Sequence, residues 1–254
     1  MILDSGSMHK IATQSLADII TNYPSAIGVM EKYALNYCCD GKRTLYQACM
    51  DIGLNIEKVL EELVSIPKII SKKQMPFAKM DVDQLLSYII IHHHYYIKES
   101  MPVIDAHLSH VKLTQGLGFP YMVKVHELFR LFMRDMILHM DREEKVLFPR
   151  IKEDEHLVKN GKSSESFSGY FQNLIKVAEV AHTEEGNVFY EIRRLTQNYK
   201  APEGAGKIFK KVLKELKEFE EDLHKHVHLE RNILFPKAIK FELRSHPVNH
   251  GIKF

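Results

Sequence analysis

The run HMDREEKVLFP at residues 139–149 returns as HVHLERNILFP at residues 226–236. In each copy a His is followed four residues later by a Glu, and then by an apolar stretch that ends in Phe-Pro. The two copies are 87 residues apart (139 to 226), and a further pair of histidines, His94 and His182, is 88 residues apart (94 to 182). An internal repeat with this spacing predicts a duplicated helical hairpin.

Helical periodicity dominates the rest of the chain. Apolar residues recur at intervals of three and four, Gly and Pro number only 12 and 9 in 254 residues, and no strand-like alternation is present. We therefore predict an all-α protein with long helices over residues 82–100, 121–152, 168–196 and 206–242, and with a first loop over residues 101–120. Four helices joined by three loops predict an antiparallel bundle over residues 80–242.

Histidine and glutamate interrupt the apolar stripes of these four helices. Residues three or four apart share one face of a helix, so His139 projects with Glu143, and His226 projects with Glu230, into the predicted core. Imidazoles and carboxylates buried there without compensation would each cost on the order of several kcal/mol, and a metal centre removes that cost. The predicted metal ligands are His94, His139, Glu143, His182, His226 and Glu230.

The chemistry of this ligand set indicates which metal it holds. Six ligands exceed the four that zinc prefers, and they suit two transition ions bridged by two carboxylates. Imidazole and carboxylate without thiolate favour iron, with manganese or zinc as alternatives. A ferritin-like site would show Glu-x-x-His, whereas here His precedes Glu by four residues. Ordinary core or surface histidines are the alternative for any single position, but the duplicated register disfavours that interpretation for the whole set.

Neighbouring residues leave alternatives open around this set. His93 is the second choice to His94, because only one of two consecutive helical residues can lie centrally on a face. Asp135 and Asp222 each stand one turn before a predicted histidine ligand. Each is either a carboxylate that orients an imidazole or a surface acid paired with Arg or Lys. Glu185 is a weaker candidate for the same role.

Composition restricts the class of protein and its compartment. With 35 Lys+Arg against 33 Asp+Glu, the net charge is +2, which gives no reason to expect a nucleic-acid partner. No run of about 18 apolar residues exists to span a membrane, and the N-terminus lacks the apolar core of a signal peptide. Three cysteines do not make a disulfide framework. We expect a cytoplasmic protein with reduced thiols and no membrane partner.

The N-terminal part of the chain has a separate pattern of short amphipathic pieces. It predicts a small helical domain over residues 8–66, followed by a linker over residues 67–79 that is rich in Lys and bracketed by proline. A polar stretch at residues 40–42 interrupts the pattern. The chain is therefore expected to have two domains.

Two adjacent cysteines, Cys38 and Cys39, are the chemical feature of this N-terminal domain. Thiolates are good soft ligands and reductants, so the pair is expected to handle metal or electrons, with two structural thiols as the alternative. Lys42 and Arg43 follow closely and would favour the thiolate form. Cys49 lies outside this pattern and has no assigned role.

The order of the six predicted ligands resembles that of the hemerythrin-like di-iron domain, and the likeness covers about residues 80–242. The stretch YCCDGKRTL at residues 37–45 is similar to the short domain of the repair-of-iron-centres family of the ScdA type. The resemblance thus covers nearly the whole chain. It implies a small helical N-terminal domain that carries the vicinal cysteines, followed by an antiparallel hemerythrin-like four-helix bundle with a non-haem di-iron site.

The resemblance also implies a function. It predicts a di-iron protein that repairs iron–sulfur clusters damaged by nitrosative or oxidative stress, by supplying iron or electrons. The expected cofactor is two non-haem iron ions with oxo or hydroxo bridges, with Cys38 and Cys39 receiving iron or electrons. The expected partners are damaged iron–sulfur proteins and the small diatomic ligands nitric oxide and dioxygen.

The sequence leaves alternative functions and the oligomeric state open. The alternative functions are a di-iron nitric oxide reductase or oxidase, and an oxygen binder or sensor of the hemerythrin type, so whether the protein is an enzyme is left open. A flexible linker would let the cysteines reach the bundle of the same chain or of a second copy, which makes a homodimer an option.

Overall fold

The computed structural model describes residues 5–66, 77–162 and 170–245 of the chain. Helices account for most of these residues and no strand occurs among them, so the all-α prediction is confirmed. Within the described ranges, no helix is both long and apolar enough to cross a membrane. Most of the predicted linker, residues 67–76, lies outside the described residues.

Two compact units make up the fold. One contains the residues up to 81 together with residues 227–234, and the other contains residues 82–226 and those from 235 onward. Residues 227–234 continue a helical rod that runs over residues 207–245. The predicted domain limits, 8–66 and 80–242, remain predictions.

Short helices form the N-terminal part of the first unit. They are α1 (Ser5–Ala12), α2 (Leu16–Asn22), η1 (Pro24–Ala26), α3 (Ile27–Lys32), α4 (Leu45–Asp51), α5 (Ile56–Ser65) and η2 (Phe77–Lys79). Thr44 begins α4 with a capping box, in which its hydroxyl accepts a hydrogen bond from the Gln47 backbone and the Gln47 side chain accepts one from the Thr44 backbone. Leu16, Leu45 and Val59 are fully buried and anchor the small core.

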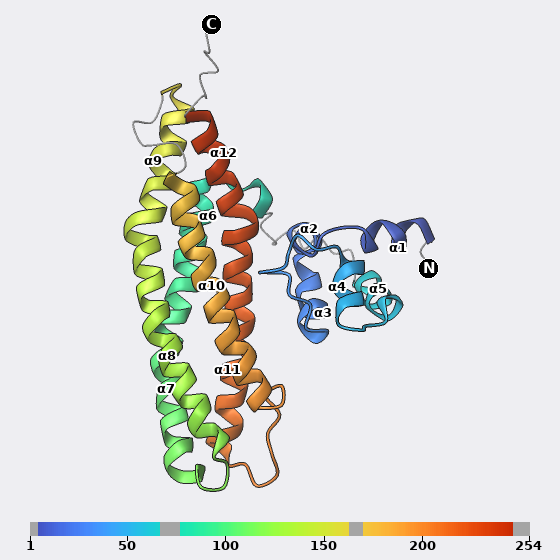
Figure 1. The fold of residues 1–254 in the computed structure, drawn as a ribbon, viewed down its shortest axis with the longest axis vertical. Helices are drawn as coiled ribbons and strands as arrows, with labels where there is room; N and C mark the ends of the chain where they lie inside the picture. The colour runs from blue at the N-terminus through green and yellow to red at the C-terminus, as the bar shows by residue number, and fades with distance from the viewer. Residues whose placement is uncertain (1–4, 67–76, 163–169, 246–254) are drawn as a thin grey trace, which may run out of the picture. The chain divides into compact units, whose positions relative to one another are not determined.

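Four long helical rods lie side by side in the bundle (Figure 1). In chain order they are α6 (Val82–Tyr88), η3 (Ile89–His94) and α7 (Tyr95–Gln115); α8 (Tyr121–Arg142), η4 (Glu143–Leu147) and α9 (Phe148–Lys159); α10 (Tyr170–Leu195); and α11 (Lys207–Leu229), η5 (Glu230–Leu234) and α12 (Phe235–Ser245). Helix α8 packs against α7 and α10, and α9 packs against α6 and α12. The predicted four-helix bundle is confirmed.

The first rod is longer than the sequence predicted. We expected a loop over residues 101–120, but α7 continues through Pro102 to Gln115. A proline inside a helix removes one backbone hydrogen bond, to the carbonyl four residues earlier. Pro102 lies on the exposed side, where water can replace that bond. The buried residues Met101, Ile104 and Leu108 meanwhile continue the apolar stripe at helical spacing.

An aromatic cluster fills the core of the bundle. The rings of Phe129, Phe132, Phe189 and Phe219 come from three of the rods, and at most 1% of each residue is exposed. Most of their contacts are edge-to-face, with ring centroids 5.0 Å apart for Phe132 and Phe189. Such ring contacts stabilise the core beyond the effect of the apolar area that they bury, so this layer holds the rods at a fixed separation.

Candidate metal centre

Three π-helical segments interrupt the rods beside the predicted ligands. His94 is the last residue of η3, Glu143 is the first residue of η4, and Glu230 is the first residue of η5. A π-helical turn holds more residues than an α-helical turn, and such turns occur frequently at functional sites. Each segment therefore changes which side chains a rod turns toward the core at the level of these ligands.

The structure brings the six predicted ligands into two groups. One group is His94, Glu143, His226 and Glu230, and the other is His139, Glu143, His182 and Glu230. In each group one possible ligand atom from every residue lies within 4.8 Å of the others, and all six residues are buried. Glu143 and Glu230 belong to both groups, so each carboxylate is placed to serve two ions.

The distances inside the first group fit a metal ion. The Nε2 atoms of His94 and His226 lie 3.1 Å apart. Two nitrogens that each lie about 2.1 Å from one ion, at a right angle, are separated by roughly 3 Å. The donor set fits as well, because neutral imidazole and carboxylate are suitable ligands for iron.

Glu143 is the residue whose position links the two groups most directly. Its Oε2 atom lies 3.1 Å from Nε2 of His139 and 3.5 Å from Nε2 of His94. These histidines belong to different groups. One carboxylate oxygen is thus within reach of the ligand nitrogens of both groups.

Sequence reasoning missed one carboxylate at this site. Glu144 lies next to Glu143 and accepts a hydrogen bond from Nδ1 of His94 at 2.8 Å. Lys98 donates to the same Glu144 oxygen at 2.7 Å. The hydrogen bonds from His94 and Lys98 lower the pKa of Glu144 to about 2, although its burial acts in the opposite direction. Glu144 therefore stays ionised and fixes the orientation of the His94 ring.

The sequence left open the roles of three further carboxylates, Glu185, Asp222 and Asp135, and the structure gives each a different environment. Glu185 is buried, with its Oε1 atom 3.6 Å from Nδ1 of His139. Asp222 lies 3.0 Å from Nδ1 of His93, whose buried ring stacks on that of His226. Asp222 thus contacts an imidazole, but not one of the six. Asp135, in contrast, is exposed and pairs with the neighbouring Arg134.

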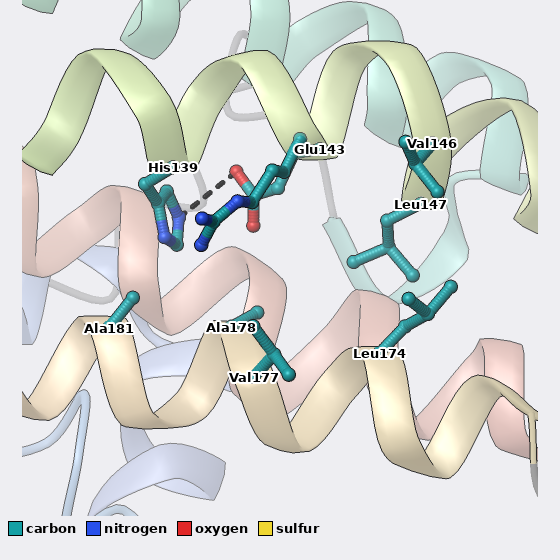
Figure 2. Close-up of a pocket in the computed structure, with 9 residues that line it drawn as sticks. His139, Glu143, Val146, Leu147, Leu174, Val177, Ala178 and Ala181 are labelled. Atoms are coloured by element: carbon teal, nitrogen blue, oxygen red, sulfur yellow. Dashed lines mark ion pairs between the residues drawn. The ribbon is translucent and has the colours of Figure 1, made fainter.

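A small pocket opens beside the second group, between α8, η4 and α10 (Figure 2). Its volume is about 110 Å³. Its lining is mostly apolar and includes Leu147, Val177 and Ala178, while His139 and Glu143 also contribute to its wall. A small neutral molecule therefore has room next to two of the predicted ligands.

The two vicinal cysteines lie close together in the first unit. Their sulfur atoms are 3.7 Å apart, and Asn36 Oδ1 accepts hydrogen bonds from the Cys38 thiol and from the Cys39 backbone. The neighbouring Cys39 thiol and burial raise the pKa of Cys38 well above its ordinary value of 9.0. The expectation that nearby basic residues favour the thiolate is wrong for Cys38, and Arg43 pairs with Asp51 instead.

Comparison with known proteins adds two family matches. Residues 85–238 match the hemerythrin HHE cation binding domain, and residues 12–66 match ScdA_N, described as a domain of unknown function. The first match covers more than half of the chain. Together with the His/Glu groups, it indicates a non-haem iron site.

Curated relatives align over most of this chain. The iron-sulfur cluster repair protein ScdA of Staphylococcus haemolyticus is 25% identical over 222 residues, which cover 87% of this chain and 96% of the relative. The iron-sulfur cluster repair protein YtfE of Enterobacter sp. is 27% identical over 237 residues, covering 90% and 98%. The YtfE protein of Yersinia pseudotuberculosis is 28% identical over 229 residues, with the same coverage.

Proposed function

Because the chain belongs to the hemerythrin HHE cation-binding family, we propose that its bundle holds two non-haem iron ions at the two His/Glu groups. His94 and His226 bind one iron, and His139 and His182 bind the other. Glu143 and Glu230 bridge the pair, because each belongs to both groups. Oxo or hydroxo bridges complete the coordination, since six protein residues do not fill the positions around two octahedral ions.

The protein acts in the repair of iron–sulfur clusters damaged by nitrosative or oxidative stress. The observation that carries this proposal is the pair of His/Glu groups sharing two carboxylates, in a chain that aligns with iron–sulfur cluster repair proteins over about nine-tenths of its length. The partners are then damaged iron–sulfur proteins. A bound di-iron centre supplies iron or electrons for this chemistry.

The chain's own residues have distinct tasks in this function. The four histidines and two glutamates hold the metal, and Glu144 orients His94. The apolar pocket beside His139 and Glu143 admits small neutral ligands such as nitric oxide and dioxygen. Cys38 and Cys39 receive iron or electrons, and their sulfur atoms are close enough to act as a pair.

The test replaces the shared carboxylates with amides. Glu143→Gln and Glu230→Gln keep the side-chain shape and remove the negative charge, so we expect both iron content and the recovery of a nitric-oxide-damaged [4Fe–4S] enzyme to be lost. Glu153→Gln is the control, because Glu153 is an exposed acid paired with Arg150. Full repair by a metal-free variant would overturn the proposal. Sustained catalytic turnover of nitric oxide, or a stable dioxygen adduct, in a protein without repair activity would instead favour the alternatives.

A further inference from the structure

The turn that carries the vicinal cysteines, residues 37–41, is attached to the helical segment that begins with Glu230. We propose that Asn232 is a positioning residue that holds this cysteine turn on η5, so that iron binding at Glu230 lowers the reactivity of Cys39. The inference rests on the proposed function, because it requires iron at the His/Glu groups. It adds an order of events, in which the thiols become available after iron has left.

The side-chain amide of Asn232 connects η5 to the cysteine turn. Its Nδ2 atom donates to the backbone oxygens of Tyr37 and Cys38, at 3.3 and 3.2 Å. All of these residues belong to the first unit, because η5 is part of it. The backbone oxygen of Cys38 belongs to the peptide group that joins the two cysteines. Asn232 therefore fixes the backbone between the two thiols.

A buried histidine next to η5 orients the Asn232 amide. Nδ1 of His228 lies 3.2 Å from Nδ2 of Asn232, and Nε2 of His228 lies 3.4 Å from the hydroxyl of Thr21 in α2. A neutral imidazole accepts at one nitrogen and donates from the other, so His228 accepts from Asn232 and donates to Thr21. The ring of His228 also meets that of Tyr37 edge-on, with centroids 5.7 Å apart. Helix α2 and the cysteine turn are thus held by the same rod.

Gly41 shows how closely the cysteine turn approaches Asn232. A Cβ atom at Gly41 would lie 2.9 Å from Oδ1 of Asn232, 2.6 Å from the backbone oxygen of Tyr37 and 2.9 Å from Cβ of Ala17. Such distances are shorter than a Cβ atom tolerates, so only glycine fits here. The backbone oxygen of Gly41 is itself held, because it accepts from the Ala17 N–H at 2.9 Å. The cysteine turn therefore contacts Asn232 at both Cys38 and Gly41.

One short helical segment links the Glu230 carboxylate to this attachment. Glu230 is the first residue of η5 and Asn232 is the third. A buried carboxylate is costly in an apolar core and metal ligation offsets that cost, so η5 is expected to open less often when iron is bound. Opening of η5 would carry Asn232 away from the backbone oxygens that it holds. Iron binding is therefore expected to slow reactions of the partly exposed Cys39 thiol.

The same coupling acts in the opposite direction. A coupling free energy between two sites is reciprocal, so an attachment that iron stabilises must in turn stabilise bound iron by the same factor. Residues 37–41 include no member of either His/Glu group. A substitution in the cysteine turn is nevertheless expected to change the affinity for iron.

The first experiment measures alkylation of Cys39 by iodoacetamide in the full chain, with and without anaerobically loaded ferrous iron, by peptide mass spectrometry. We expect loading to slow the reaction by about 5-fold or more, since couplings between sites typically start at this size. Asn232→Leu removes the amide without adding a charge beside Glu230. It should raise the rate in the iron-free chain and make the loaded and iron-free rates converge. Asn187→Leu, which replaces an exposed amide on α10, is the matched control and should keep the effect of iron.

Two results of this experiment would overturn the inference. One is an equal rate of Cys39 alkylation in the loaded and iron-free unaltered chain. The other is protection by iron that persists in Asn232→Leu, because iron bound directly by the thiols would protect them without Asn232.

The second experiment measures iron affinity, by equilibrium competition with a ferrous chelator, after a change in the cysteine turn. Gly41→Ala forces the turn away from Asn232, so the affinity should fall by up to the factor found in the alkylation experiment. Gly28→Ala is the matched control, because a Cβ atom at Gly28 in α3 meets no described heavy atom within 4 Å. Unchanged affinity in a Gly41→Ala chain whose circular dichroism is that of the unaltered protein would overturn the coupling. If Gly41→Ala does not fold, the alkylation of Asn232→Leu decides the question.

Failure of this inference and failure of the proposed function give different results. Iron uptake with equal thiol rates, in a protein that repairs clusters, would refute the inference alone. Thiol rates that depend on iron and on Asn232, in a protein that repairs no clusters, would refute the repair role and leave the inference in place. A chain that takes up no iron would refute both.

Discussion

The Nε2 atoms of His94 and His226 face each other at 3.1 Å, although the two residues belong to the first and last rods of the bundle. Between two neutral imidazoles, one nitrogen must donate and the other accept. With a metal ion between them, both nitrogens direct lone pairs at the ion. Metal binding is therefore expected to displace the shared proton and to tie the first rod to the last.

Removal of one of these two imidazoles should affect one metal position. We expect His226→Ala to lower the iron content from about two to about one per chain, because the group of His139 and His182 keeps both of its histidines. Elemental analysis of protein loaded under identical conditions measures this change. His224→Ala is the control, since His224 stands two residues away and belongs to neither group. Two irons retained in His226→Ala would refute the ligand assignment.

Removal of iron should lower the stability of the bundle. A ligand that binds only the folded state stabilises it by about 2.7 kcal/mol when its free concentration is 100 times Kd. The site joins all four rods, so the metal-free chain is expected to unfold at a lower temperature. Calorimetry before and after anaerobic chelation measures the shift, with Glu143→Gln as the control that should respond little to chelator. An unchanged Tm in the unaltered protein would contradict binding of iron in the core.

The sequence was sufficient to predict which residues meet in the bundle. Histidine and glutamate four residues apart share a helical face, and the repeat supplies a second copy, so the combination predicts convergence in a common core. The structure brings together all six predicted residues. The aromatic layer is likewise expected from apolar residues at helical spacing.

The sequence did not predict the role of Glu144, the burial of both His93 and His94, or the helix that continues through Pro102. All three depend on local departures from the regular α-helix. In a regular α-helix, consecutive side chains point about 100° apart around the axis. Glu143 and Glu144 would therefore face different directions, and so would His93 and His94. The π-helical segments η3 and η4 reduce that rotation, and both members of the His93–His94 pair are buried. A loop was expected at Pro102 because proline usually ends a helix. Here Pro102 is on the exposed side, so water can replace the backbone hydrogen bond that proline cannot donate.

The aromatic layer should be the most sensitive part of the bundle core. Phe219 is fully buried and contacts Phe129, Phe132 and Phe189. We expect Phe219→Ala to cost about 3–5 kcal/mol, through lost apolar burial and the cavity that remains. Tyr190→Ala is the control, because Tyr190 is 62% exposed. Equal destabilisation of the two variants in urea unfolding would contradict the packing described.

The two vicinal thiols should differ in reactivity. Cys38 is buried, and the neighbouring thiol and its burial raise its pKa above 9.0, whereas Cys39 is partly exposed. The thiolate is the reactive form, so at about pH 8 iodoacetamide should modify Cys39 well before Cys38. Peptide mass spectrometry over time measures both rates, and Cys38→Ser provides a chain in which only the Cys39 rate should remain. Faster modification of Cys38 would contradict this arrangement.

The N-terminal helices α3 and α5 should respond to acid through Glu62. Lys32 and Tyr33 each donate a hydrogen bond to Glu62 at 2.6 Å, and these bonds lower its pKa below the ordinary value of 4.5. A carboxyl whose pKa is lower in the folded state stabilises that state above its unfolded pKa, and this contribution is lost as the pH falls through the folded pKa. Glu62→Gln should therefore destabilise these helices near neutral pH and have progressively less effect below about pH 4. Amide hydrogen exchange of α3 and α5 across this range measures the difference, with exposed Glu61→Gln as the control. A constant difference between Glu62→Gln and the unaltered chain at all pH values would mean that the side chain acts through packing rather than through its charge.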